Sequence, residues 1–513
     1  MQKAAIMPFV PPLRGFPGQR RALDAHLGRD RPKARDGRGA ASQSLVHKAA
    51  LLLVFIAVAS SSLVFSEPAP VDALNIALIF GLPVVGLVAW KRTLTGYLSL
   101  WLLIAASGFL AATMAYDSPR ATVHFAISLY LYLSAFIFAG FVARAPAAHA
   151  RLICNAYLAA ALIAAAAGVI GYFGIAPGST ELFTLYSRAS GTFKDPNVFG
   201  AFLVPAVVYV IHLWLERPVA RAIPMAIAGG LLALGVLLSF SRGAWAVCLL
   251  AIAGYWYLAF ATAPTNRRRL WLLGLPLLAA VATAGLVAMA IQNDSIEQLA
   301  TERATLTQTY DEGAEGRFGG QLRALEIIAM SPFGIGALEF TPGFHVNGMM
   351  MPNHSDGRGF GDDPHNSYIS MFLNAGWLAG VINFVIMVLT VTLGLRHAFR
   401  RTPSQPLFIV VYVAVVAQLI EGAIIDIDHW RHLHLLLGVL WGLMAATEPM
   451  VRAPRIVADH RPLLRRPVLI IPPSRRDRRI VRELVRRPLL IGLPGVHRAV
   501  TRQRRPVRIS SRH

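Results

Sequence analysis

The chain has 513 residues, of which 55% are hydrophobic and only 15% are charged, yet its net charge is +22. A soluble chain ordinarily carries about 25% charged residues, and two cysteines are too few for a secreted disulfide scaffold. The composition therefore argues against a soluble enzyme, a nucleic-acid-binding domain and a disulfide scaffold. Residues 1–48 hold +7 and residues 448–513 hold +14 of the net charge. The middle of the chain is close to neutral, which predicts an integral membrane protein with basic ends.

Twelve apolar stretches are long enough to cross a membrane, because a spanning helix needs about 20 mostly apolar residues. In chain order they cover residues 46–65, 71–90, 97–115, 121–143, 152–175, 198–215, 222–239, 243–262, 270–291, 366–394, 407–427 and 431–447. Only Ser239 to Arg242 separates the seventh stretch from the eighth, and the last stretch is short. The sequence thus predicts an all-α polytopic membrane protein with about 12 transmembrane helices.

The chain accordingly divides into five regions. They are a basic, disordered N-terminal extension over 1–45, nine spans within 46–291, a large polar loop over 292–365, three spans within 366–447, and an Arg- and Pro-rich tail over 448–513. Lys and Arg gather in alternate loops of the middle region, and basic loops usually face the cytoplasm. This asymmetry predicts that both ends of the chain are cytoplasmic and that the large loop lies outside.

Four groups of polar residues fall on the outer side of this topology. The first lies in residues 191–200 and contains Lys194, Asp195 and Asn197. Asp195 followed by Pro196 favours a helix start, with Asp as the N-cap and Pro in the first helical position. Helix capping alone leaves Lys194 and Asn197 unexplained, and the alternative is a loop that holds a cation and amides near a lipid phosphate.

The second and third groups centre on arginines. Arg242 lies in residues 239–245, between two closely spaced spans, and is either an interfacial anchor or a forked donor to phosphate oxygens. Arg317 and Arg323 lie in the large loop, where they are either ordinary loop charges or further cations of the same site. Residues 321–330 could form a short helix on the membrane surface.

The fourth group lies at the start of the tenth span, in residues 361–368. Asp363 followed by Pro364 again indicates a helix cap, which would place His365 in the first helical turn beside Asn366. Histidine titrates near neutral pH, so it is suited to act as a general base.

Other chemistry is less well supported. The large loop is rich in His and Asp, but it has no metal-ligand spacing on a helix, so neither a metal nor a cofactor is expected. The spans are nearly free of the ionisable groups that ion-coupled transporters bury. Glu421 is the clearest exception, with Asp426 and Asp428 after it. Glu421 either faces the site or pairs with an arginine.

Three stretches carry a family resemblance. They are Gly191-Thr-Phe-Lys-Asp-Pro-Asn-Val-Phe-Gly200, Ser241-Arg242-Gly243, and His365-Asn366 followed by Gly376. Together they resemble the O-antigen ligase and Wzy-type O-antigen polymerase family of bacterial envelope glycosyltransferases, over residues 46–447. The order of Arg317, then residues 332–336, then His365 also fits. Two positions depart from the family pattern: Ala379 replaces its second glycine, and Gln321 replaces an aromatic residue that often follows the loop arginine.

The resemblance implies a GT-C-like membrane enzyme of the inner membrane, with a periplasmic active site. Such an enzyme would move a glycan from undecaprenyl diphosphate to a lipid A-core sugar, or to a growing polysaccharide if it is a polymerase, without metal and with inversion. His365 would accept the acceptor's proton, and Arg242 and Arg317 would stabilise the diphosphate. Donor-binding residues would be Lys194, Asp195, Asn197, Arg323 and Asn366. The alternatives are a small-solute transporter and a non-catalytic assembly partner.

Overall fold

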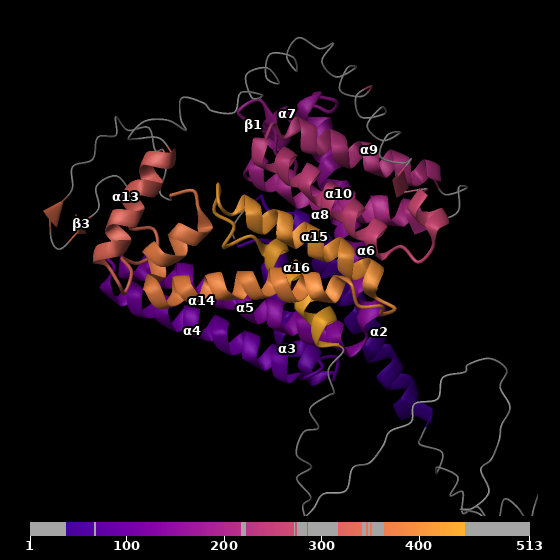
Figure 1. Cartoon of the computed structure of the whole chain (residues 1–513), viewed down its shortest axis with the longest axis horizontal. Helices are drawn as coiled ribbons and strands as arrows, with labels where there is room; N and C mark the ends of the chain where they lie inside the picture. Colours follow the sequence, from indigo (N-terminus) through magenta and orange to yellow (C-terminus); the bar gives the residue numbers. More distant parts are fainter. Residues whose placement is uncertain are drawn as a thin grey trace, which may run out of the picture. The chain divides into compact units, whose positions relative to one another are not determined.

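The structure is a computed structural model. It describes residues 37–65, 68–216, 222–270, 272–273, 285, 317–340, 345–346, 349–350 and 364–446. Within these residues the chain is almost entirely α-helical (Figure 1). The basic ends, most of the predicted ninth span and most of the large loop lie outside the described residues.

The first eight apolar helices precede the large loop. They and the short elements among them are α2 (Gly37–Ala59), η1 (Ser60–Ser62), α3 (Pro70–Val84), α4 (Arg92–Met114), α5 (Ser118–Arg144), α6 (Pro146–Tyr172), α7 (Ser179–Phe183), β1 (Thr184–Leu185), β2 (Arg188–Ala189), α8 (Pro196–Glu216), α9 (Ala222–Leu238) and α10 (Arg242–Thr262). The two short strands pair antiparallel as a hairpin before α8.

The second part contains three further apolar helices. Its elements are α13 (Arg317–Met330), β3 (His345–Val346), β4 (Met349–Met350), α14 (Ser367–Ala398), α15 (Gln405–Glu421) and α16 (Arg431–Ala445). Strands β3 and β4 pair antiparallel. Helix α13 contains the short helix that was predicted over 321–330, but it begins four residues earlier.

Seven of the described helices are long and apolar enough to cross a membrane, namely Leu45–Ser62, α4, α5, α6, α8, α10 and α14. Four more apolar helices are shorter, namely α3, Ile223–Leu238, α15 and α16. Each of these helices coincides with a predicted span, which confirms the class of all-α membrane protein. The total of twelve spans stays a prediction.

Small residues allow the helices to approach closely. At the contact between α5 and α16, a Cβ on Gly438 would lie 2.5 Å from the carbonyl oxygen of Ala135, and a Cβ on Gly442 would lie 2.5 Å from that of Ala139. Glycines four residues apart against alanines four residues apart bring two backbones into van der Waals contact, as is common between helices in membranes. This packing places the start of α16 beside α5.

A partly buried ion pair holds the start of α16 to α3. Arg431 donates to both oxygens of Asp72, at 2.7 and 3.0 Å. The hydroxyl of Tyr130 and the backbone N–H of Ala69 also donate to this carboxylate. These four donor groups compensate the desolvation of the Asp72 carboxylate. The segment between α15 and α16 is therefore fixed where it meets α16, at Arg431.

Helix α14 is broken at Gly376, where φ is 84° and ψ is 176°. The segment after α13 fills this break. The N–H groups of Ile335 and Gly336 donate to the carbonyls of Leu373 and Asn374, at 2.9 and 3.2 Å. These carbonyls would otherwise lack partners, because the break removes their helical donors.

Two further contacts complete the junction. The N–H of Trp377 donates to the carbonyl of Pro332 at 2.9 Å, and the Ser107 hydroxyl of α4 donates to the carbonyl of Ala375 at 2.7 Å. Helix α13 is thereby fixed beside the first half of α14 (Figure 1). The break thus positions the helix that begins at Arg317.

Two contacts join loops that fall on the same side of the predicted topology. Glu216 and Arg268, which were both predicted inside, form an ion pair. The backbone N–H of Asp117 donates to the carboxylate of Glu339 at 2.8 Å, and both were predicted outside. Which side faces the cytoplasm stays a prediction.

Candidate functional site

The loop before α8 contains the capping arrangement that its sequence predicted. The carboxylate of Asp195 accepts from the N–H of Asn197 at 2.5 Å, and its carbonyl accepts from the N–H of Phe199 at 3.0 Å. Pro196 is the first residue of the helix. Asp195 is therefore an N-cap, while the side chain of Lys194 is exposed.

A residue that the sequence analysis missed joins the first two groups. Arg188 is 9% exposed; its Nε donates to the carbonyl of Ser239 at 2.8 Å, and its Nη2 donates to the Asn197 side-chain oxygen at 2.7 Å. The guanidinium thus links the loop before α8 to the turn between α9 and α10. The only signal in the sequence was an arginine three residues before the motif that begins at Gly191.

The turn between α9 and α10 positions Arg242. Phe240 has a left-handed backbone, with φ of 44°, and the hydroxyl of Ser241 accepts from the N–H of Ala244 at 3.3 Å. Ser241 is therefore the N-cap, and half-buried Arg242 is the first residue of α10. The two helices that were predicted on either side of Ser239 to Arg242 are confirmed as separate.

Glu421 lies against this turn. Its side-chain Oε1 is 2.8 Å from the position that a Cβ on Gly243 would occupy. Glu421 is only 2% exposed, and its Oε2 has no hydrogen-bond partner within the described part of the chain. The carboxyl group at the end of α15 therefore faces the first turn of α10.

The helix start at the fourth group differs from the prediction. Asn366, and not Asp363, is the N-cap of α14: its side-chain oxygen accepts from the N–H groups of Tyr368 and Ile369, at 3.1 and 3.2 Å. His365 precedes the cap, with a left-handed φ of 49°, so its predicted place in the first helical turn is wrong. Because His365 has a left-handed backbone, a helix that begins at Pro364 cannot continue through it. The helix therefore begins after Asn366, and Asn is as effective an N-cap as Asp.

The segment between α15 and α16 binds this helix start. The side-chain nitrogen of Asn366 donates to the carbonyl of Ala423 at 2.9 Å, and the Ser370 hydroxyl donates to Asp426 at 2.7 Å. The Asp426 carboxylate also accepts from the backbone N–H of His365. Asp426 lies outside the helices, and burial, followed by the nearby charge of Asp428, raises its pKa. The loop therefore holds His365 and Asn366 at the end of α15.

These contacts form a continuous path through three of the four groups. Arg188 joins Asn197 to the Ser239 turn, Glu421 touches that turn, and Gly422, next along the chain, accepts from the N–H of Ser367 at 2.8 Å. The third group, on α13, reaches α14 through the segment that fills the break at Gly376. Arg317 is the first residue of α13, and Arg323 is exposed on that helix.

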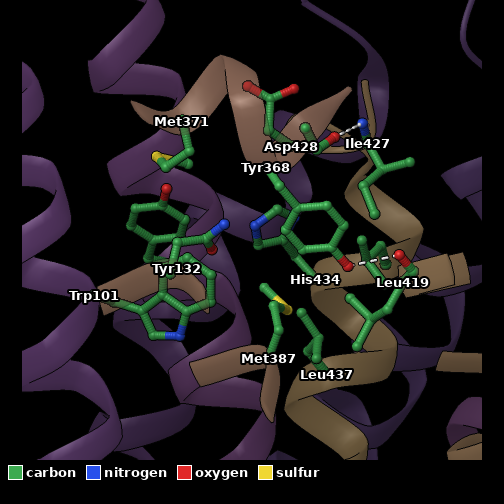
Figure 2. A pocket seen from close by; sticks show the side chains of 13 residues that line it. Trp101, Tyr132, Tyr368, Met371, Met387, Leu419, Ile427, Asp428, His434 and Leu437 are labelled. Carbon is green, nitrogen blue, oxygen red and sulfur yellow. Dashed lines mark hydrogen bonds between the residues drawn. The ribbon is translucent and has the colours of Figure 1, made fainter. Parts of the chain in front are cut away.

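A cavity lies beneath the loop that follows α15 (Figure 2). Asp428 lies at one end of it and Met387 and Leu437 at the other, with Trp101 and Tyr132 along the side. It has about 30 Å³ of space for water-sized molecules. A water needs about 10–15 Å³, whereas ligand pockets have several hundred. The cavity fits water, and a sugar would have to bind elsewhere.

The fold and these groups define a polytopic α-helical membrane protein with polar side chains joined across the ends of its helices. A family model described as O-antigen ligase matches residues 227–384. The matched residues are similar to this family, as the motifs predicted. The matched stretch contains Arg242, Arg317 and His365 but not Lys194 or Asn197. No curated protein matches the chain.

The match supports, in general terms, a function of the O-antigen ligase or polymerase type. Four members of the His- and Asp-rich part of the large loop, His354, Asp356, Asp362 and Asp363, lie outside the described residues.

Proposed function

We propose that the protein is an O-antigen ligase-like glycosyltransferase that moves a glycan from undecaprenyl diphosphate to a hydroxyl of a lipid A-core sugar. The observation that carries the proposal is the path from Arg242, through Gly243, Glu421 and the loop after α15, to His365. It joins a permanent cation to a candidate base across segments far apart in the sequence.

The proposed reaction is a single displacement. The acceptor oxygen bonds to the anomeric carbon of the donor sugar as the bond from that carbon to the diphosphate oxygen breaks, which inverts the configuration. His365 takes the proton of the acceptor hydroxyl. The diphosphate leaves with additional negative charge, which Arg242 and Arg317 stabilise electrostatically. Because guanidinium groups supply this charge, the transfer needs no metal ion.

The remaining predicted residues would bind and orient the donor. Lys194 and Arg323 are exposed cations that could reach phosphate oxygens. Asn197 and Asn366 both make hydrogen bonds that fix local structure, as Asp195 does in its cap. We assign these three residues to positioning, and we place the site on the periplasmic face of the inner membrane with both ends of the chain in the cytoplasm.

Polymerase activity is the second candidate, because the family match covers both types of transfer. It would use the same donor and the same residues, and only the acceptor would differ: a second glycan repeat instead of a lipid A-core sugar. Supplying both acceptors to one preparation therefore distinguishes the two activities.

Loss of transfer in two variants tests the proposal. In proteoliposomes with a polyprenyl-diphosphate-linked glycan and a lipid A-core acceptor, His365→Ala should lower the rate by about 10²–10⁴-fold, since it removes the general base. Arg242→Ala should lower it by about 10²–10³-fold, since it removes a donor to the developing charge. Product formation is followed by gel mobility of the modified acceptor.

The control is Arg269→Ala, which changes an exposed arginine in the short helical segment after α10, on the opposite side of the predicted membrane. It should transfer at the wild-type rate. Normal transfer by a correctly inserted His365→Ala variant would contradict the assignment of the base.

A further inference from the structure

Two histidines and an aspartate from distant segments meet at a place that the glycosyl-transfer proposal does not use. His124 lies in the second turn of α5, and Asp428 and His429 lie in the loop between α15 and α16. One ligand atom from each residue lies within 4.8 Å of the others. The Nε2 of His124 is 3.6 Å from the Oδ2 of Asp428, and the two imidazole rings are 4.1 Å apart between centroids.

We propose that His124, Asp428 and His429 bind one divalent transition-metal ion of the zinc class, with a water in the fourth position. Zinc is bound by His nitrogen and carboxylate oxygen at about 2.0–2.2 Å, and two His with one carboxylate is a known ligand set. Ligand atoms around a tetrahedral ion are then about 3.4 Å apart. The observed separations, within 4.8 Å of one another, therefore need to contract by at most about 1.4 Å.

The hydrogen bonds around His429 favour the ligating form of its ring. The hydroxyl of buried Ser128 donates to the carbonyl of His124 at 3.2 Å. In the proposed site, the imidazole is the donor in the 2.8 Å contact between Ser128 Oγ and His429 Nε2, while the Ser128 proton stays on the carbonyl of His124. The other ring nitrogen, Nδ1, then keeps the lone pair that a metal requires. A metal-bound histidine is typically oriented by such a second hydrogen bond.

Asp428 is also held in place. Its Oδ1 accepts from the backbone N–H of His429 at 3.1 Å, which leaves Oδ2 directed to His124. All three side chains are partly exposed, so an ion can enter.

The ion would join α5 to the loop that holds the proposed base. In this loop, the carbonyl of Ala423 accepts a hydrogen bond from the Asn366 side chain, and the carboxylate of Asp426 accepts one from the backbone N–H of His365. A metal at Asp428, two residues further on, would fix the loop from its other side. Its role is structural, so the metal-free chemistry proposed for glycosyl transfer is unaffected.

The experiment measures binding directly, on the full-length protein in detergent with a tag that lacks histidine. The protein is stripped with chelator and titrated with Zn²⁺, and metal content and thermal midpoint are recorded. We expect one zinc per chain and a midpoint raised by a few degrees at saturation, because an ion that binds only the folded state stabilises it. Co²⁺ should give the visible absorption of a tetrahedral site.

Variants locate the site. His124→Ala and Asp428→Asn should lower zinc affinity at least 100-fold and abolish the zinc-dependent rise in midpoint, and His124→Gln serves if the alanine variant does not fold. The matched control is His345→Ala with His354→Ala, which should bind zinc as the wild type does. The proposal is overturned if the wild type does not bind one zinc per chain. It is also overturned if zinc binding is lost in the control variant but kept in His124→Ala and Asp428→Asn. The proposal is also overturned if His124→Ala lowers the thermal midpoint while zinc changes the midpoint of neither the wild type nor the variant. His124 and Asp428 would then form an ion pair without a metal.

Discussion

Replacing Gly376 by alanine is expected to destabilise the protein by on the order of 4 kcal/mol. At φ 84° and ψ 176°, Gly376 occupies a backbone region that is essentially restricted to glycine, which costs another residue about 1–3 kcal/mol. The new Cβ would also lie 2.6–2.8 Å from backbone atoms of Pro332 and Phe333. The turn after α13 would have to move and lose hydrogen bonds of about 1 kcal/mol each.

Unfolding in mixed micelles measures this change, and a neighbouring glycine gives the matched control. Gly320 lies inside α13 and a Cβ there would meet nothing within 4 Å. Gly320→Ala should therefore be neutral or stabilise by about 0.5–1 kcal/mol, the ordinary gain for Gly to Ala in a helix. Equal stability of Gly376→Ala and the wild type would show that the junction of α13 with α14 is not as described.

Replacing Arg188 by alanine should destabilise the protein by a similar amount, about 3–5 kcal/mol. The variant loses two hydrogen bonds from a charged donor, each worth about 1.5–3 kcal/mol. The Asn197 side-chain oxygen and the carbonyl of buried Ser239 also lose the donor that Arg188 supplies. Because the turn at Ser239 positions Arg242, glycan transfer should fall with stability.

Two variants make this expectation specific. Arg188→Lys keeps the charge but cannot reproduce the planar fork that reaches both oxygens, so it should recover less than half of the lost stability. Arg120→Ala removes an exposed arginine at the start of α5 and should change stability by less than about 0.5 kcal/mol. Full recovery by lysine would mean that only the charge at position 188 is required.

The apolar helices could be predicted because the length of a hydrophobic run decides whether it can span a bilayer. Each of the eleven apolar helices within the described residues lies where such a run was found. The separation of α9 from α10 was also predictable, since Ser241 and Arg242 form a polar interruption with a capping residue.

Contacts between distant segments could not be predicted in this way. Nothing near Arg188 in the sequence shows that its partners are Asn197 and Ser239. The sequence indicated a cap at Asp363, whereas the left-handed backbone of His365 places the cap at Asn366. Gly376 was recognised only as part of a motif, whereas its physical reason is a break that another segment fills.

The sequence by itself determined the class of protein, the places of the apolar helices and the residue types available for chemistry, because these follow from local hydrophobicity and charge. Tertiary structure alone decided that Glu421 faces the first turn of α10, and that the loop after α15 holds His365 and Asn366. It also brought His124 to Asp428 and His429. The physical reason is that a side chain's partners depend on which helices pack together, and packing depends on small residues such as Gly438 and Gly442 that have no local signature.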